Sequence, residues 1–256
     1  MDQKRIIDEF KELVSIEVHS RDERSIADVL KEKLTALGLT VTEDKAGEVL
    51  GGNTGNLYAQ LPGSADGEPV LFSAHMDRVG NHGHIVPLVK EEEGKIVSDG
   101  TSILAGDDIG GVAAILAMLR EVKEKQIPHG PIEVAFSVCE ETGVEGSRQY
   151  DFSKFRSKSA FVYDASGKAG TIVLAAPSKG RVTIRVHGVT AHAGNEPEKG
   201  LNALKVAADL IMQLPDGRLS PVSTANFSII EAGSATNVVC DLVTITGEQR
   251  SRDAKE

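Results

Sequence analysis

The 256-residue sequence is short of cysteine, of positive charge and of long apolar runs, and each shortage excludes a class of protein. The two cysteines, Cys139 and Cys240, are far apart in strand-like segments, which excludes a disulfide framework and a paired-cysteine metal site. The sequence has 28 basic and 38 acidic residues, so its formal net charge is −10 and nucleic acid is not an expected partner. No apolar run approaches the ~18 residues of a membrane span, and the charged N-terminus is no secretory signal. We therefore expect a cytoplasmic protein without a membrane partner.

Apolar and charged residues, in contrast, are present in the proportions of an ordinary folded protein, 40% and 26%. Apolar residues at helical spacing predict two helices in residues 1–40, with Gly38 as the stop. Strand-like runs follow at 39–43, 56–61, 69–75, 132–138 and 160–164, and a long helix is expected at 108–126. Strands that alternate with helices predict an α/β fold, a mixed sheet flanked by helices.

The pattern changes near Pro177, where RVTIRVHG (181–188) alternates apolar with polar residues, as in a sheet with one buried face. A helix at 201–214 and strands at 225–231 and 241–249 give the order β-α-β-β. We predict a first domain at residues 1–176 and a second, α+β domain at residues 177–256. The second domain is expected to be incomplete, because such a sheet normally gains another helix and strand.

Metal-type ligands stand where the predicted strands end, the edge at which α/β sheets gather functional side chains. They are His75 after 69–74, Glu140 and Glu141 after 132–139, Asp164 after 160–163, and Asp107 before the long helix. Each alone has a plainer interpretation: a histidine can lie on the surface, and an aspartate can cap a helix or form a turn. Their coincidence at one edge favours a site.

A pair of zinc ions is the chemistry that suits this set, because zinc binds imidazole nitrogen and carboxylate oxygen. The candidate ligands are His75, Asp107, Glu141 and Asp164. Asp77 is placed to accept a hydrogen bond from the second ring nitrogen of His75. Glu140, beside a ligand, is placed to take a proton from an attacking water.

Four motifs make the sequence recognisable: SAHMD (73–77), SDGTSILAGDD (98–108), VCEETG (138–143) and VYDASG (162–167). In this order and spacing they resemble the peptidase T (tripeptidase) branch of a di-zinc metallopeptidase family that includes carboxypeptidase G and aminoacylase. The resemblance implies that His75 and Asp164 hold one zinc, Glu141 holds the other and Asp107 bridges them. It also implies that Glu140 is the general base and that Asp77 orients His75.

The resemblance further implies that the second domain is a lid that also forms a homodimer. His192 in VTAHAG would stabilise the oxyanion, often in the partner subunit, and Asn237 in ATNVV would contact substrate. Arg250 in TGEQRSRD would grip a substrate carboxylate, a role that suits a forked, always charged guanidinium. Arg250 could equally be a solvated strand residue, and Asn237 a turn or cap residue.

Three departures from the family pattern stand out. Ile109 replaces a lysine after the Asp pair, and Arg78 replaces a small residue after HMD. The family's last zinc ligand, a histidine beyond the lid, has no counterpart in these 256 residues. Since three protein ligands suffice for zinc, we expect this form to hold one zinc of the two, to hold the second weakly and to be catalytically poor.

The function predicted from the sequence is a zinc-dependent exopeptidase of short peptides, acting as a tripeptide aminopeptidase. Two alternatives stay open. An amidohydrolase of N-acyl amino acids would use the same metal site with another pocket. A truncated, non-catalytic chain could instead serve as a dimerising or metal-binding module.

Overall fold

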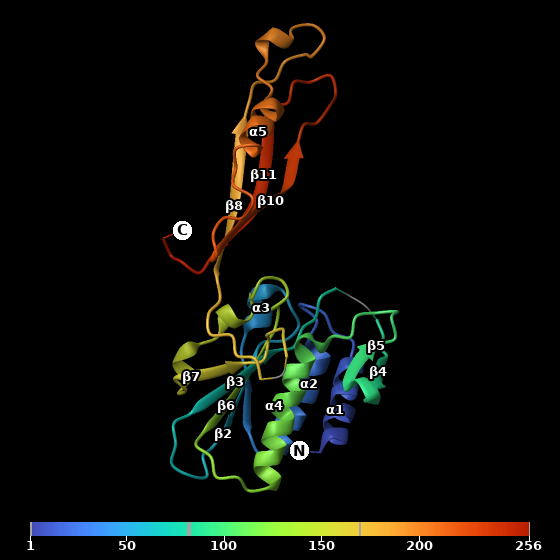
Figure 1. The fold of residues 1–256 in the computed structure, drawn as a ribbon, viewed down its shortest axis with the longest axis vertical. Helices are drawn as coiled ribbons and strands as arrows, with labels where there is room; N and C mark the ends of the chain where they lie inside the picture. Colours follow the sequence, from blue (N-terminus) through green and yellow to red (C-terminus); the bar gives the residue numbers. More distant parts are fainter. Residues whose placement is uncertain (1, 81–82, 169, 256) are drawn as a thin grey trace. The chain divides into compact units, whose positions relative to one another are not determined.

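The chain divides into two compact units, Met1–Gly167 and Lys168–Glu256, in a computed structural model that describes residues 2–80, 83–168 and 170–255 (Figure 1). This division falls slightly before the domain boundary predicted from the sequence. Among the described residues, no helix has the length and apolar character needed to cross a membrane.

The first unit is built on a five-stranded sheet in the order β1-β2-β6-β3-β7. Its strands are β1 (Thr40–Glu43), β2 (Leu57–Leu61), β3 (Val70–His75), β6 (Ile132–Ser137) and β7 (Ser159–Val162). Strands β1, β2 and β6 are antiparallel neighbours, whereas β6, β3 and β7 run parallel. This mixed sheet with its helices confirms the predicted α/β class.

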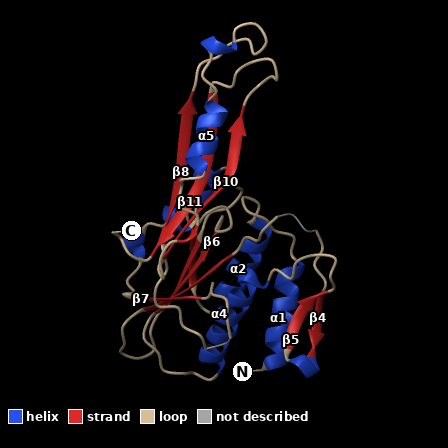
Figure 2. Ribbon diagram, turned by 45° about the horizontal axis from the view of Figure 1, so that its top comes forward, coloured by secondary structure: helices blue, strands red, loops and turns tan. Residues whose placement is uncertain are grey.

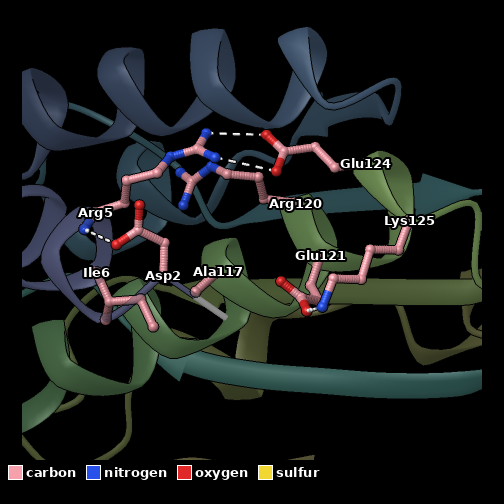
Figure 3. A pocket seen from close by; sticks show the side chains of 8 residues that line it. All are labelled: Asp2, Arg5, Ile6, Ala117, Arg120, Glu121, Glu124 and Lys125. Carbon is pink, nitrogen blue, oxygen red and sulfur yellow. Dashed lines mark hydrogen bonds and ion pairs between the residues drawn. The ribbon is translucent and has the colours of Figure 1, made fainter.

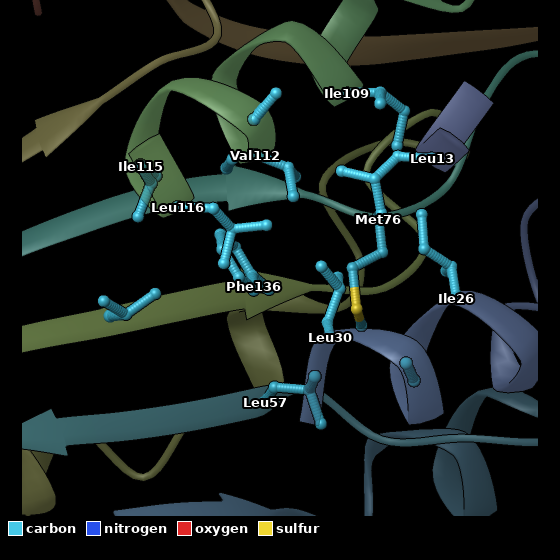
Figure 4. Packing of buried hydrophobic residues seen from close by; sticks show 14 of the residues in the cluster. Leu13, Ile26, Leu30, Leu57, Met76, Ile109, Val112, Ile115, Leu116 and Phe136 are labelled. Atoms are coloured by element: carbon cyan, nitrogen blue, oxygen red, sulfur yellow. The ribbon is translucent and has the colours of Figure 1, made fainter. Parts of the chain in front are cut away.

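Helices α1 (Gln3–Ser15), α2 (Arg24–Ala36) and α4 (Gly106–Glu124) enclose the main core. Each presents an apolar stripe at helical spacing, as the sequence predicts. Leu13, Ile26, Leu30, Ile115 and Leu116 from these stripes pack with Leu57 of β2 and Phe136 of β6 (Figure 4), and all seven are fully buried. The core therefore fixes α4 and the strand ends that carry the candidate ligands.

A short helix and a small two-stranded sheet of this unit were not predicted. Helix α3 (Ala46–Leu50) has only five residues, and β4 (Pro87–Lys90) pairs with β5 (Lys95–Ser98) in a separate two-stranded sheet. The turn between β4 and β5 ends at Gly94, whose φ of 62° lies in the left-handed region that favours glycine. Strand β7 is an edge strand, and its four residues are all exposed.

The second unit is a four-stranded antiparallel sheet on which helix α5 (Ala203–Ile211) packs (Figure 2). It contains β8 (Ser178–His187), β9 (Gly217–Arg218), β10 (Ser223–Ala232) and β11 (Leu242–Ser251), in the sheet order β8-β11-β10-β9. Ala203 and Ala207 of α5 pack with Val243 and Ile245 of β11 in a small core. The β-α-β-β order matches the prediction, and the two-residue β9 is an addition to it.

Candidate metal centre

Three parallel strands end at one edge of the sheet in the first unit. Because β6, β3 and β7 are neighbours and run in the same direction, their carboxyl ends meet there. His75 closes β3. The chain carries Glu140 and Glu141 just after β6 and Asp164 just after β7, and Asp107 stands in the first turn of α4. The fold thus brings these side chains together from four separate segments.

Two groups of ligand atoms lie close enough to share a cation. One contains His75, Asp107 and Glu141, the other His75, Glu140 and Asp164, and the atoms of each group lie within 4.8 Å of one another. The imidazole belongs to both groups, and its Nε2 is 2.9 Å from Asp107 Oδ1. The cluster therefore offers one nitrogen and four carboxylates.

This grouping overlaps only in part with the arrangement that the resemblance implies. There, Asp164 and Glu141 belong to different ions, Asp107 bridges the two ions, and Glu140 is not a ligand. In the structure Asp107 lies with Glu141, whereas Asp164 lies with Glu140 and not with Asp107. The side chain of Asp107 is 70% exposed, so its carboxylate has room to turn, whereas the His75 side chain is only 2% exposed.

The electrostatics of the cluster favour a bound cation. Burial by itself would lower the pKa of His75, but its contacts with Asp77, Asp108 and Asp107 outweigh burial and raise it to about 10. Burial and neighbouring acids raise the pKa values of Glu140 and Glu141. Since one imidazole stands among several carboxyl groups, the donor set fits a divalent cation that takes nitrogen and oxygen ligands, such as zinc.

Asp77 lies directly behind this cluster and is fully buried. Its main-chain oxygen is 3.0 Å from His75 Nδ1, and its carboxylate Oδ1 is 3.4 Å from the same nitrogen. In the neutral ring, a proton on Nδ1 leaves the lone pair of Nε2 for a metal ion. The carboxylate of Asp77 also accepts the hydroxyl of Ser20 at 2.6 Å.

Asp108 is a residue for which the sequence predicted no site role. It is 2% exposed, and its Oδ2 accepts the main-chain amide of His75 at 3.1 Å. Burial raises the pKa of its carboxyl to about 7. A Cβ on Gly111 would lie 2.3 Å from Asp108 Oδ1, so the glycine makes room for this carboxyl. The sequence feature that could have indicated a site role for Asp108 is its position next to the candidate ligand Asp107.

The two departures near the ligands, Arg78 and Ile109, are both buried. Arg78 Nη1 donates to the main-chain oxygen of Val14 at 3.2 Å, near the carboxyl end of α1. A cation is favourable there because the carboxyl end of a helix carries partial negative charge. Ile109 belongs to the main core. Ile109 therefore contributes to core packing, and Arg78 satisfies one of the last carbonyl groups of α1.

In the second unit, His192 and Asn237 come together although they are distant in sequence. His192 forms a bridge with Val238, and the amide of Ala193 donates to the main-chain oxygen of Asn237 at 3.0 Å. His192 Nδ1 accepts the amides of Gly194 and Asn195 at 3.1 and 3.2 Å. In the neutral ring the proton is then on Nε2, which can donate a hydrogen bond.

Arg250 lies at the other end of the same sheet. Its β11 neighbour Ser251 pairs with Ser178, while the opposite end of the strand pairs Leu242 with His187. At about 3.3 Å per residue these ends are roughly 30 Å apart. His192 lies in the connection that follows His187. A single copy of this unit therefore cannot bring Arg250 and His192 to one small substrate.

A cavity of about 340 Å³ lies between α1 and the carboxyl-terminal half of α4 (Figure 3). Its charged side chains are engaged with one another. Arg5 makes two hydrogen bonds of 3.0 Å to Glu124, Glu121 pairs with Lys125, and Arg120 reaches Glu9 at 2.6 Å. We therefore regard this cavity as a gap in the packing of two helices and not as a candidate binding site. The candidate ligands at the sheet edge, in contrast, converge on one point.

Comparisons with known proteins agree with this geometry. Residues 56–194, more than half of the chain, match the model of peptidase family M28, and residues 177–256 match the peptidase dimerisation domain. Bacillus subtilis "Uncharacterized protein YqjE" is 39% identical over 98% of this chain and 67% of its own length.

The chain is also similar over its whole length to two solved peptidase structures. Aminopeptidase PepT from Bacillus cereus has 42% identity and a TM-score of 0.91, and a tripeptidase from Staphylococcus aureus has 36% identity and a TM-score of 0.94. The chain spans 68% of the length of each of these two. Against carboxypeptidase G2 of Pseudomonas, at 30% identity, it spans 60%.

The mixed α/β sheet, with an imidazole and carboxylates at the ends of its parallel strands, is the arrangement of a metal-dependent hydrolase. The two family matches and the two solved structures then show that the chain belongs to the peptidase T-like metallopeptidases.

Proposed function

We propose that the chain is a zinc-dependent exopeptidase that removes the N-terminal residue of short peptides, with tripeptides as its substrates. The observation that carries the proposal is the convergence of His75, Asp107, Glu140, Glu141 and Asp164 at the ends of parallel strands. The likeness to an aminopeptidase PepT and a tripeptidase supports the substrate class. Both cysteines are unpaired, which fits the cytoplasmic location predicted from the sequence.

His75, Asp107, Glu141 and Asp164 would hold the metal. The chemistry that zinc supplies when bound is activation of a water molecule and polarisation of the scissile carbonyl. Both ligand groups need the single imidazole of His75, and Nδ1 of that ring already contacts Asp77. The second group also needs Glu140, which we propose as the general base. The described residues therefore offer one complete three-ligand group without the base, and we propose one tightly held zinc per chain.

Glu140 is the proposed general base. Its side chain is half-buried, and its main-chain amide donates to Asp77 Oδ1 at 2.9 Å, which holds the residue at the edge of the cluster. Burial raises the pKa of its carboxyl, and a raised pKa suits a group that accepts a proton and then releases it. Glu140 would accept a proton from the attacking water and return it to the leaving amine.

Residues 1–176 would form the catalytic domain, and residues 177–256 a lid that also forms a homodimer, in line with the dimerisation-domain match. Arg250 would bind the substrate carboxylate through its Nη groups, while its Nε donates to Glu248 Oε1 at 2.8 Å. His192, with Nε2–H free to donate, would stabilise the oxyanion, and Asn237 beside it would contact substrate. Arg250 and the connection that carries His192 lie at opposite ends of a sheet whose strand β11 spans roughly 30 Å, so the partner subunit would supply one of them.

A subunit-complementation experiment tests this shared site. His192→Ala and Arg250→Ala chains should each be inactive alone, because each homodimer lacks one group in both sites. Mixed dimers contain one intact site, so an equal mixture should regain about a quarter of the wild-type activity. The measurement is peptide hydrolysis after dissociation and reassociation of the two proteins. A mixture as inactive as its components would contradict sharing, and so would a mass of 27.2 kDa, that of one chain, at all concentrations.

The substrate class is tested by comparing tripeptides with N-acetyl amino acids on zinc-loaded protein. We expect kcat/KM for tripeptides to exceed that for N-acetyl amino acids at least about tenfold, since losing a binding contact of only about 1.4 kcal/mol lowers kcat/KM by that factor. Glu140→Gln protein prepared in parallel controls for contaminating peptidases. A preference for N-acetyl amino acids would move the chain to the amidohydrolases instead.

A further inference from the structure

Four consecutive main-chain amides follow strand β6, and each donates to the side chain of a buried residue. The amide of Val138 donates to Asn56 Oδ1 at 3.0 Å and that of Cys139 to Glu23 Oε1 at 3.0 Å. The amides of Glu140 and Glu141 donate to the two carboxylate oxygens of Asp77, at 2.9 and 3.2 Å. The three acceptors, Asn56, Glu23 and Asp77, are all 0% exposed.

This segment, residues 138–141, carries the proposed general base and a proposed metal ligand. It leaves the strand in an unfavourable conformation, because Cys139 has a φ of 50°, in the left-handed region that non-glycine residues avoid. Main-chain amides that leave a ladder need other acceptors when they are buried. Three side chains from distant parts of the chain supply them here.

Glu23 is the least expected of the three acceptors. It occupies the N-cap position of α2, yet its side chain makes no capping hydrogen bond. Instead the side chain turns inward to Cys139, whose Sγ also lies 3.6 Å from the same oxygen. A fully buried carboxyl group is costly to desolvate, and the hydrogen bond from the amide of Cys139, the residue preceding Glu140, offsets part of that cost.

We infer that Glu23 is a positioning residue for the metal-binding segment: by holding the Cys139 amide, it fixes the backbone from which Glu140 and Glu141 extend toward His75. Asp77 fixes the next two amides, and Ser20, on the same connection between α1 and α2 as Glu23, holds the carboxylate of Asp77. The connection between α1 and α2 thus supports the site without contributing a ligand. This inference rests on the proposed metal site.

The test is the affinity for divalent cations, measured by competition with a chromogenic chelator for Zn²⁺ and by the visible absorption spectrum of the Co²⁺-loaded protein. Glu23→Ala should weaken Zn²⁺ binding about 10- to 100-fold, the usual effect of losing a group that supports a ligand. It should also change the Co²⁺ spectrum. Glu23→Gln keeps an acceptor oxygen for the Cys139 amide and should stay within roughly threefold of wild type.

Glu133 provides the matched control. It is also a buried carboxyl, and it accepts the consecutive main-chain amides of Arg156 and Ser157 at 3.0 Å each. It stands near the start of β6, away from the ligands at the strand's end. Glu133→Ala should therefore lower the unfolding temperature but leave the Zn²⁺ affinity within roughly threefold of wild type.

The outcomes separate the two proposals. If wild-type protein binds Zn²⁺ and folded Glu23→Ala protein binds it equally well, or Glu133→Ala weakens binding as much, the positioning role is overturned. If the wild type binds neither cation, the proposed metal site fails and the positioning role with it. Should Glu23→Ala not fold, Glu23→Asp carries the same test, because the shorter side chain keeps the charge but withdraws the oxygen from Cys139.

Discussion

Replacing Glu140 with glutamine is expected to abolish peptide hydrolysis while the metal content of the protein stays unchanged. The amide is nearly the same size as the carboxyl group but cannot accept and return a proton. Loss of general acid–base catalysis lowers kcat by about 10²- to 10⁴-fold. Since the main-chain amide of Glu140 is held by Asp77 at 2.9 Å, the substitution should leave the backbone in place. Steady-state hydrolysis of a tripeptide, with elemental analysis of the same sample, measures both quantities.

The neighbouring residue supplies the control for this experiment. Glu141→Gln changes the same chemical group one position on, yet it should lower the metal content, because Glu141 groups with His75 and Asp107. Glu140 also lies within reach of a cation together with Asp164. If Glu140→Gln loses metal and Glu141→Gln does not, the roles of the two glutamates are exchanged, and Glu141 becomes the candidate base.

The sequence was sufficient to predict the residues that converge, because all but Asp107 stand at or just after the end of a strand, and Asp107 stands at the start of the long helix. His75 follows a run that becomes β3, and Glu140 and Glu141 follow the run that becomes β6. Parallel neighbours end at one edge, so strand order alone brings these residues together. The exact partition of carboxylates could not be predicted, since it depends on side-chain directions a few ångströms apart.

The hydrogen bonds that hold the candidate site in place could not be predicted from the sequence. Glu23 contacts a residue 116 positions away, Asn56 one 82 positions away, and Ser20 one 57 positions away. No local period or spacing connects such pairs. From the sequence, a glutamate at the start of a helix would be interpreted as an N-cap. In the structure the side chain of Glu23 makes no capping hydrogen bond and instead accepts the amide of Cys139.

The β4–β5 hairpin, in contrast, left a signal that was overlooked. Two short runs rich in valine, isoleucine and leucine flank a glycine at position 94, which is the pattern of a hairpin with a short loop. Helix α3 could not be predicted in this way, because five residues are too few to show a helical period. Among the described residues, neither element supplies a member of the candidate ligand groups, so the prediction of the site did not depend on them.

Replacing His75 with alanine is the second change with a large expected effect, because this residue belongs to both groups of candidate ligands. Wild-type protein should contain about one zinc per chain, since three protein ligands are enough to hold zinc with water in the fourth position. The variant should contain almost none, because carboxylates alone form a site suited to harder cations. Hydrolysis should be lost with the metal.

Metal per chain, from elemental analysis and amino-acid quantification, is the measurement. His84→Ala is the matched control: His84 is exposed in the loop before β4 and belongs to neither ligand group, so this variant should keep its zinc. About two zinc ions in the wild type would mean that the two ligand groups are filled at once and do not compete for one imidazole. Zinc retained after His75→Ala would place the metal elsewhere and remove the basis for assigning Glu140 its role. Loss of zinc from His75→Ala alone would identify this imidazole as the ligand on which the site depends.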